Sequence, residues 1–176
     1  MEEQKIKTNK IALNFGVILG IISILLAVIL YITDNLLKQS WVTSVVGFLI
    51  TIGVIVYALS TFKKANGGFM SLTEALKIGV GVALIGGLIA GMYNVIFLTY
   101  IEPDFTEQIV EQQRMTLTEE YPNFTEDQIN QSLDMTRKFS KPWISLAFYV
   151  ILNLFFGFII SLIAGLVMKK EDPYKA

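Results

Sequence analysis

Four long stretches of the chain contain no charged residue. They cover residues 11–33, 41–62, 78–101 and 143–168, and each is 22–26 residues long. A helix rises about 1.5 Å per residue, so each stretch reaches roughly 33–39 Å, which is enough to cross a hydrocarbon core of about 30 Å with some tilt. Core helices of a soluble protein would carry a polar stripe, and these stretches have none. The pattern predicts an all-α fold, a bundle of four transmembrane helices.

The start of the third helix lies upstream of its uncharged stretch. Ser71 and Glu74 have the spacing of a capping box, and Gly67-Gly68 before them is typical of a turn. Helices are therefore expected at about 11–33, 41–62, 72–101 and 143–168, forming one membrane domain over residues 1–176.

The first stretch could also be a cleaved secretory signal, because Lys5, Lys7 and Lys10 precede it. Its 23 uncharged residues exceed the roughly 7–15 apolar residues of a signal peptide, and Ile32–Asn35 contains no small-x-small cleavage pattern. We expect this stretch to remain as the first transmembrane helix.

The segment 102–142 is polar and too long to be a plain connection. A break at Tyr121–Asn123 divides it into two expected helices, the first starting near Pro103 and the second covering residues 126–139. Thr125 and Gln128 form a capping box for the second helix, and Phe124 is placed to pack on Ile129. The segment is predicted to be a helical hairpin on the outer face of the bundle.

Lysine and arginine are distributed unevenly among the connecting segments. Residues 1–10, 63–77 and 169–176 hold nine of them in 33 residues, whereas 34–40 and 102–142 hold five in 48. The positive-inside rule predicts that the first set, with both termini, is cytoplasmic. Trp41, Tyr100 and Trp143 then lie at the outer interface, where amphipathic aromatic rings are favoured.

Small residues recur every four positions in three of the predicted helices, which allows another backbone to approach closely. They are Gly16 and Gly20 in the first, Gly79, Ala83, Gly87 and Gly91 in the third, and Gly157, Ser161 and Gly165 in the fourth. These faces serve either packing within the bundle or a homo-oligomer formed through an exposed groove.

Polar residues at membrane depth are uncharged, and Asn94 and Asn153 are the main ones. The absence of an ionisable side chain argues against a proton relay or a voltage sensor. Hydrogen bonds between helices are the ordinary role of such residues, and a solute pathway is the alternative.

Composition narrows the chemistry further. A hydrophobic share of 53% and a mean hydropathy of +0.58 make the lipid bilayer the main surrounding, and a net charge of −1 gives no attraction to nucleic acid. The chain has no cysteine and no histidine, so it lacks the usual nucleophile, general base and soft metal ligands. The nine acidic residues of 102–142 do not follow the spacing of a calcium-binding loop. We expect no catalytic, cofactor or metal site.

The glycine pair, the run Phe69–Lys77 that opens the third helix, and Tyr100–Phe105 that closes it resemble the bacterial membrane family DUF4199, of unknown function. The resemblance implies a four-helix protein of the bacterial inner membrane and carries no activity.

Two functions remain open. The chain is either a non-enzymatic interaction or assembly protein, which presents the acidic segment 102–142 to a protein partner, or a small oligomeric transporter or channel-like permeation unit. The net charge of −5 in that segment favours the first.

Overall fold

The computed structural model describes residues 7–37 and 41–171. Lys5, Lys38 and Lys175, which enter the charge count above, lie outside the described residues. The described chain is helical apart from turns and one isolated β-bridge, so the predicted all-α fold is confirmed. Its helices are α1 (Thr8–Ile32), α2 (Trp41–Ala65), α3 (Leu72–Ile96), the π-helix η1 (Phe97–Ile101), α4 (Phe105–Glu120), α5 (Glu126–Phe139) and α6 (Pro142–Met168).

Within the described residues, four helices are long and apolar enough to cross a membrane: α1, α2, α3 continued by η1, and α6. The largest differences from the expected bounds are three residues each: α1 begins three residues earlier and α2 ends three residues later. Charge alone marked Phe62 as the end, but Lys63 and Lys64 continue the last turn, where cations are favoured by the helix dipole. Lys63 Nζ also donates to the carbonyl of Met168, at 2.8 Å.

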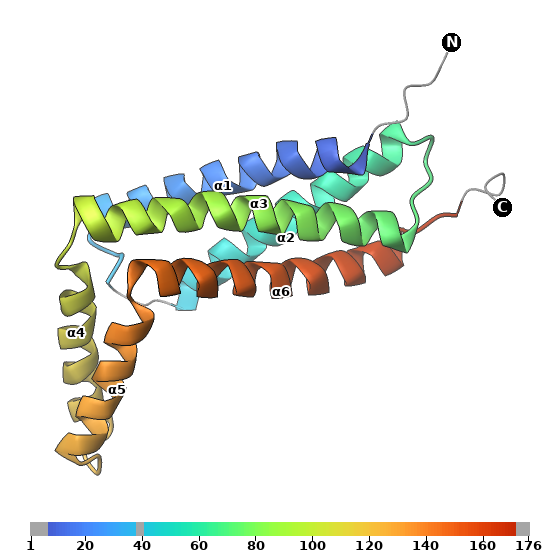
Figure 1. The fold of residues 1–176 in the computed structure, drawn as a ribbon. Helices are drawn as coiled ribbons and strands as arrows, with labels where there is room; N and C mark the ends of the chain where they lie inside the picture. Colours follow the sequence, from blue (N-terminus) through green and yellow to red (C-terminus); the bar gives the residue numbers. More distant parts are fainter. Residues whose placement is uncertain (1–6, 38–40, 172–176) are drawn as a thin grey trace.

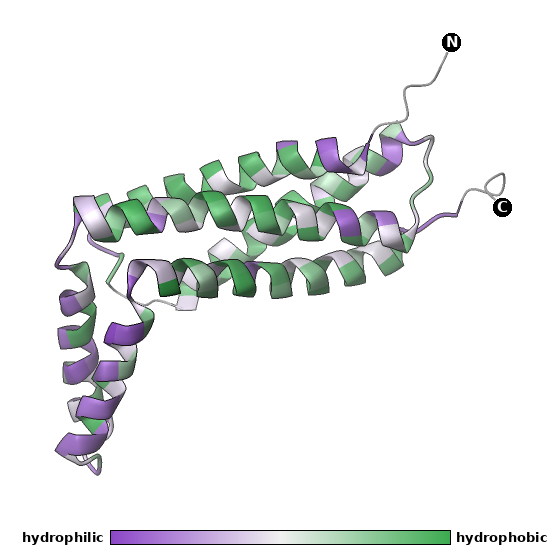
Figure 2. Ribbon diagram, viewed as in Figure 1, coloured by the Kyte–Doolittle hydropathy of each residue, from purple (hydrophilic) through white to green (hydrophobic). Residues whose placement is uncertain are grey.

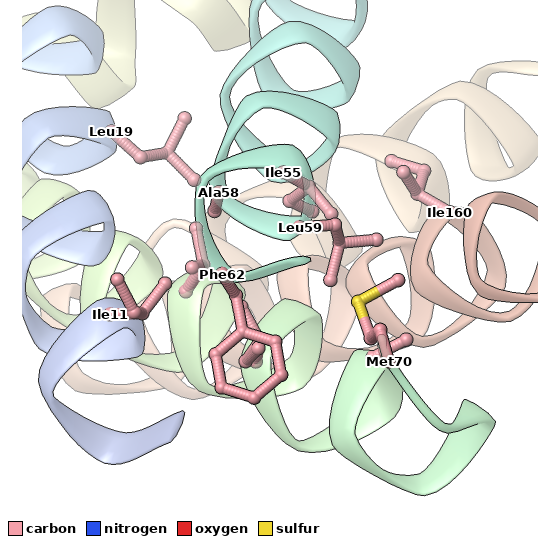
Figure 3. Packing of buried hydrophobic residues seen from close by; sticks show 11 residues of the cluster. Ile11, Leu19, Ile55, Ala58, Leu59, Phe62, Met70 and Ile160 are labelled. Carbon is pink, nitrogen blue, oxygen red and sulfur yellow. The ribbon is translucent and has the colours of Figure 1, made fainter. Parts of the chain in front are cut away.

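α3 lies between α1 and α6 and packs along both of them, while α2 crosses behind at an incline (Figure 1). The main hydrophobic core draws buried residues from α1, α2, α3 and α6. Buried α2 residues all lie in the second half of that helix, at Ile55, Ala58, Leu59 and Phe62, and Figure 3 shows them among side chains of α1, α3 and α6. The first half of α2 therefore leaves the bundle partly open.

The end of the bundle that contains the start of α1 and the end of α6 is closed by backbone pairing. Gly67 and Gly68 turn the chain with φ of 66° and 85°, values that favour glycine. Met70 and Lys170 then exchange two N–H···O bonds of 2.9 Å each, and the Lys170 ammonium lies 5.2 Å from the centre of the Phe69 ring. This pairing ties the α2–α3 connection to the end of α6.

At the opposite end, α4 and α5 lie side by side and project crosswise to the bundle axis (Figure 1). Figure 2 shows that the bundle is mainly hydrophobic and that these two helices are mainly hydrophilic. α4 begins at Phe105, two residues after Pro103, because Phe105 N–H first closes a turn on the Glu102 carbonyl. We call α4 and α5 together the α4–α5 pair.

Candidate functional site

The small residues of α3 face α6 in an antiparallel register. A Cβ added at Gly79 would collide with the Ser161 side chain, and one added at Gly157 would collide with the Ala83 Cβ. A Cβ at Gly165 would come within 2.8 Å of Ala75 Cβ. Side chains this small let the two backbones approach closely. In lipid, where the hydrophobic force between helices is weak, this close packing holds α3 and α6 together.

The same register continues toward the end of the bundle that carries the α4–α5 pair. A Cβ at Gly87 would meet the Asn153 Cβ at 3.0 Å, and one at Gly91 would meet Leu146 Cδ1 at 2.5 Å. This face of α3 is in contact with α6 over its whole length.

The small residues of α1 contact a second face of α3. A Cβ at Gly16 would lie 2.6 Å from Ile85 Cβ, and one at Gly20 would lie 2.7 Å from Ile89 Cβ. Both faces are therefore occupied by neighbouring helices of the same chain, which leaves neither as an open groove on the surface.

Three polar residues at membrane depth, Asn94, Asn153 and Ser161, have hydrogen-bond partners. Ser145 Oγ donates to Asn94 Oδ1 at 2.7 Å and so links α6 to α3. Asn153 Nδ2 donates to the Tyr149 carbonyl one turn earlier, at 2.9 Å, and the buried Ser161 hydroxyl donates to the Gly157 carbonyl at 2.7 Å. Asn94 is thus part of a link between helices, whereas Asn153 bonds within its own helix.

Asn153 also borders a cavity of about 390 Å³ between α1, α2 and α6, where the first half of α2 leaves the core. Ser23, Ser44 and Thr51 contribute further polar groups to a wall that is otherwise apolar. The spacing of small residues gave no sign of this cavity, which arises from the incline of α2.

At the closed end of the bundle, Ser71 and Glu74 make the reciprocal bonds of a capping box. Glu74 N–H donates to Ser71 Oγ at 3.2 Å, and Ser71 N–H donates to Glu74 Oε2 at 2.9 Å. These bonds satisfy backbone donors that the first turn of α3 leaves unpaired, so the role of both residues is structural.

The α4–α5 pair has a small core of its own. Val110 from α4 packs with Ile129 and Leu133 from α5, and Leu117 covers them. The second capping box is present at Thr125 and Gln128, while the Phe124 ring stacks on Tyr121 with centroids 5.1 Å apart. The tip of the pair is thus fixed by a local aromatic contact.

Charged and polar side chains join the two helices around this core. Arg137 donates to both carboxylate oxygens of Glu107 at 3.1 Å, and Arg114 donates to Asn130 Oδ1 at 2.7 Å. The hydrogen bond from Arg137 lowers the pKa of the Glu107 carboxyl, and the same bond raises the pKa of the guanidinium. Arg114 also lies 3.6 Å from Glu126.

Both arginines of the pair therefore serve contacts inside it. Among the described residues, ion pairs involve Glu107, Glu126 and Asp134, and none involves the other acidic side chains of α4 and α5. Those carboxylates are Glu111, Glu119, Glu120 and Asp127. Within residues 7–37 and 41–171, no three acidic side chains come together as a metal site would require.

Attachment of the pair to the bundle rests on few contacts. Tyr31 donates to Glu102 Oε2 at 2.8 Å, and the rings of Phe97 and Phe105 meet edge to face at 5.2 Å. Phe139 of α5 lies 5.9 Å from Phe148 of α6. The bond from Tyr31 to Glu102 joins residues 71 positions apart in the chain, so no local spacing could have indicated it.

Together, the four apolar spans define an α-helical membrane protein. The chain belongs to the family described as protein of unknown function (DUF4199), whose model matches residues 14–170. The resemblance carried by Phe69–Lys77 and Tyr100–Phe105 is thereby confirmed. No curated protein and no solved structure matches the chain.

Proposed function

We propose that the chain is a non-enzymatic interaction protein, anchored by its four spans, which presents the charged side of the α4–α5 pair to a protein partner. The observation that carries the proposal is the unequal pairing of charges in the pair. Its two arginines are used internally, while Glu111, Glu119, Glu120 and Asp127 have no ion pair among the described residues. Complementary potentials steer association, so the partner is expected to present a basic surface.

Orientation follows from the distribution of lysine and arginine. We place the closed end, with both termini, in the cytoplasm of a bacterial cell and the α4–α5 pair outside the inner membrane. The partner is then an extracytoplasmic protein or the extracytoplasmic part of another membrane protein. The bundle itself supplies the anchor, since the uncharged stretches 11–33, 41–62, 78–101 and 143–168 hold no charged side chain for recognition or chemistry.

The test uses a photo-crosslinking residue placed at Glu111 or Glu119, with one at Leu84 in the bundle as the matched control. We expect a specific adduct from the first two positions, weakened by added salt and by neutralising the two remaining carboxylates: E119Q with D127N when the crosslinker is at Glu111, and E111Q with D127N when it is at Glu119. An adduct that forms equally well after those two substitutions would contradict an electrostatic role for this side.

A small oligomeric permeation unit is the second candidate, favoured by the polar cavity that Ser23, Ser44, Thr51 and Asn153 border. An oligomer would have to form through surfaces other than the small-residue faces, because these are occupied within the chain. Flux assays in liposomes distinguish the two functions. Saturable flux that is lost in Asn153→Leu, together with unchanged adducts after removal of α4 and α5, would favour permeation.

A further inference from the structure

The chain enters α4 and leaves α5 at the level of the membrane interface. Tyr100 and Trp143 are 79% and 69% exposed, and each lies at the end of a span that leads into the pair. Exposed tyrosine and tryptophan at span ends are typical of the headgroup region of a bilayer. Glu102 follows Tyr100 by two residues, and Lys141 precedes Trp143 by two. The pair is therefore tethered at headgroup level on both sides.

The direction of the pair keeps it at that level. Because α4 and α5 run crosswise to the bundle axis and their tip lies beyond α6, they extend along the plane of the membrane (Figure 1). A pair that continued the bundle axis would instead stand out into water. The lipid around α6 thus lies beneath the pair.

The side of the pair that faces the bundle is uncharged. Two cavities border this side of the pair. One, of about 520 Å³, lies between the pair and Leu36 and Leu37 of the α1–α2 connection, and the other, of about 570 Å³, lies between the pair and α3, η1 and α6. The residues of α4 and α5 that border them define what we call the underside. It consists of Phe105, Ile109, Gln112, Gln113, Thr116, Ser132, Met135, Thr136 and Phe139. None of these is charged, although segment 102–142 carries nine acidic and four basic residues.

The apolar part of the underside continues the lipid-facing surface of α6. Met135 and Phe139 are 55% and 52% exposed, and Phe139 contacts Phe148, which is itself exposed on α6. The larger cavity has Met135, Phe139, Phe148 and Leu152 on its apolar walls, whereas Ser132 and Ser140 add hydroxyl groups. Apolar walls beside hydroxyl groups match the acyl chain and glycerol region of a phospholipid.

We propose that the underside docks on the surface of the surrounding leaflet and that a phospholipid fills the larger cavity. The charged side of the pair, with Glu111 and Asp127, then faces away from the membrane. Lys138 and Lys141 at the base of α5 extend their ammonium groups toward lipid phosphates, as lysines near an interface do. This inference does not depend on the proposed partner, because lipid contact holds whether or not a protein binds the other side.

Spin labels test the docking in the intact chain, which contains no native cysteine. A label at Met135→Cys is compared with one at Asp127→Cys, both on exposed positions of α5. In phosphatidylcholine liposomes, we expect the Met135 label to collide several times more often with oxygen, which dissolves in lipid, than with a water-soluble nickel chelate. The Asp127 label is expected to show the reverse.

The same labels in nanodiscs holding one protein copy identify the occupant. Oxygen preference at Met135 that persists in these discs supports docking on lipid. Equal access of the chelate to both positions would overturn the proposal. A Met135 label that is shielded in liposomes but reached by the chelate in single-copy discs would also overturn it, because a second copy would then be the cover.

Discussion

Gly79 and Gly53 are both helical glycines, but their surroundings differ. A Cβ at Gly79 would collide with Ser161, whereas a Cβ at Gly53 would meet nothing within 4 Å. We expect Gly79→Ala to lower the free energy of unfolding by about 1–3 kcal/mol, the cost typical of overpacked cores. Gly53→Ala, the matched control, should leave it unchanged or slightly raised, because alanine favours helix more than glycine does.

Thermal unfolding of both variants in detergent, followed by size-exclusion recovery, measures this difference. Equal losses of stability in Gly79→Ala and Gly53→Ala would show that the α3–α6 contact is not a tight one. The effect would then be a general one of replacing a helical glycine.

At the residue scale, the sequence indicated a face of small residues on α3 but not the helix that this face meets. The four-residue spacing of Gly79, Ala83 and Gly87 predicted the stripe, and the structure places it against α6. Its partner depends on how helices distant in the chain come together, and so do the contacts of Tyr31 with Glu102 and of Asn94 with Ser145. Residue spacing describes one helix and carries no information about the neighbour it will meet.

Among the elements, the α4–α5 pair is joined to the bundle by few contacts and has a separate core at Val110, Ile129 and Leu133. Leu133→Ala should therefore loosen the pair and leave the spans intact. Removing a fully buried leucine side chain costs about 2–5 kcal/mol. The expected result is faster amide hydrogen exchange throughout α4 and α5, with α1 and α3 unchanged.

Met115→Ala provides the control, since that side chain on α4 is largely exposed and does not border the underside. If amide hydrogen exchange in Leu133→Ala rose equally in the bundle, the pair and the bundle would unfold as one unit.

Acidification should also loosen the pair through Glu107. The hydrogen bond from Arg137 lowers the pKa of this carboxyl below its ordinary value of 4.5. A depressed pKa means that the stabilisation is present at neutral pH and is lost as pH falls through the lowered value. Amide exchange in α4 and α5, corrected for its intrinsic pH dependence, should then rise at acid pH.

Arg137→Gln tests the assignment. The variant should exchange faster at neutral pH and show a smaller further change on acidification, because the partner that lowers the Glu107 pKa is gone. If acidification raised amide exchange in α4 and α5 of the variant as much as in the original protein, the effect would have to come from carboxylates other than Glu107.

Elements were the scale at which the sequence was most informative. Charge-free stretches located the spans, and the Thr125–Gln128 capping box located the start of α5 at Glu126. The π-helix at Phe97–Ile101 and the incline of α2 were not foreseen. The π-helix and the incline depend on how α3 and α2 contact other parts of the molecule. A uniformly apolar stretch of sequence gives no indication of such contacts.

For the whole molecule, the proposed function depends on which side of the membrane carries the α4–α5 pair. The closed end bears the basic residues Lys63, Lys64 and Lys170, and the pair lies at the other end with its acidic surface. The proposed extracytoplasmic partner follows from this polarity, whereas the lipid contact of the underside does not depend on it.

Single cysteines at Ala65 and Asn123 measure the orientation in the membrane most directly, because both positions are exposed and lie at opposite ends of the molecule. In intact cells, a membrane-impermeant maleimide should label Asn123→Cys at once and Ala65→Cys only after the inner membrane is permeabilised. Labelling of both positions from the same side would contradict the four-span account, and labelling of Ala65→Cys alone would reverse the proposed orientation.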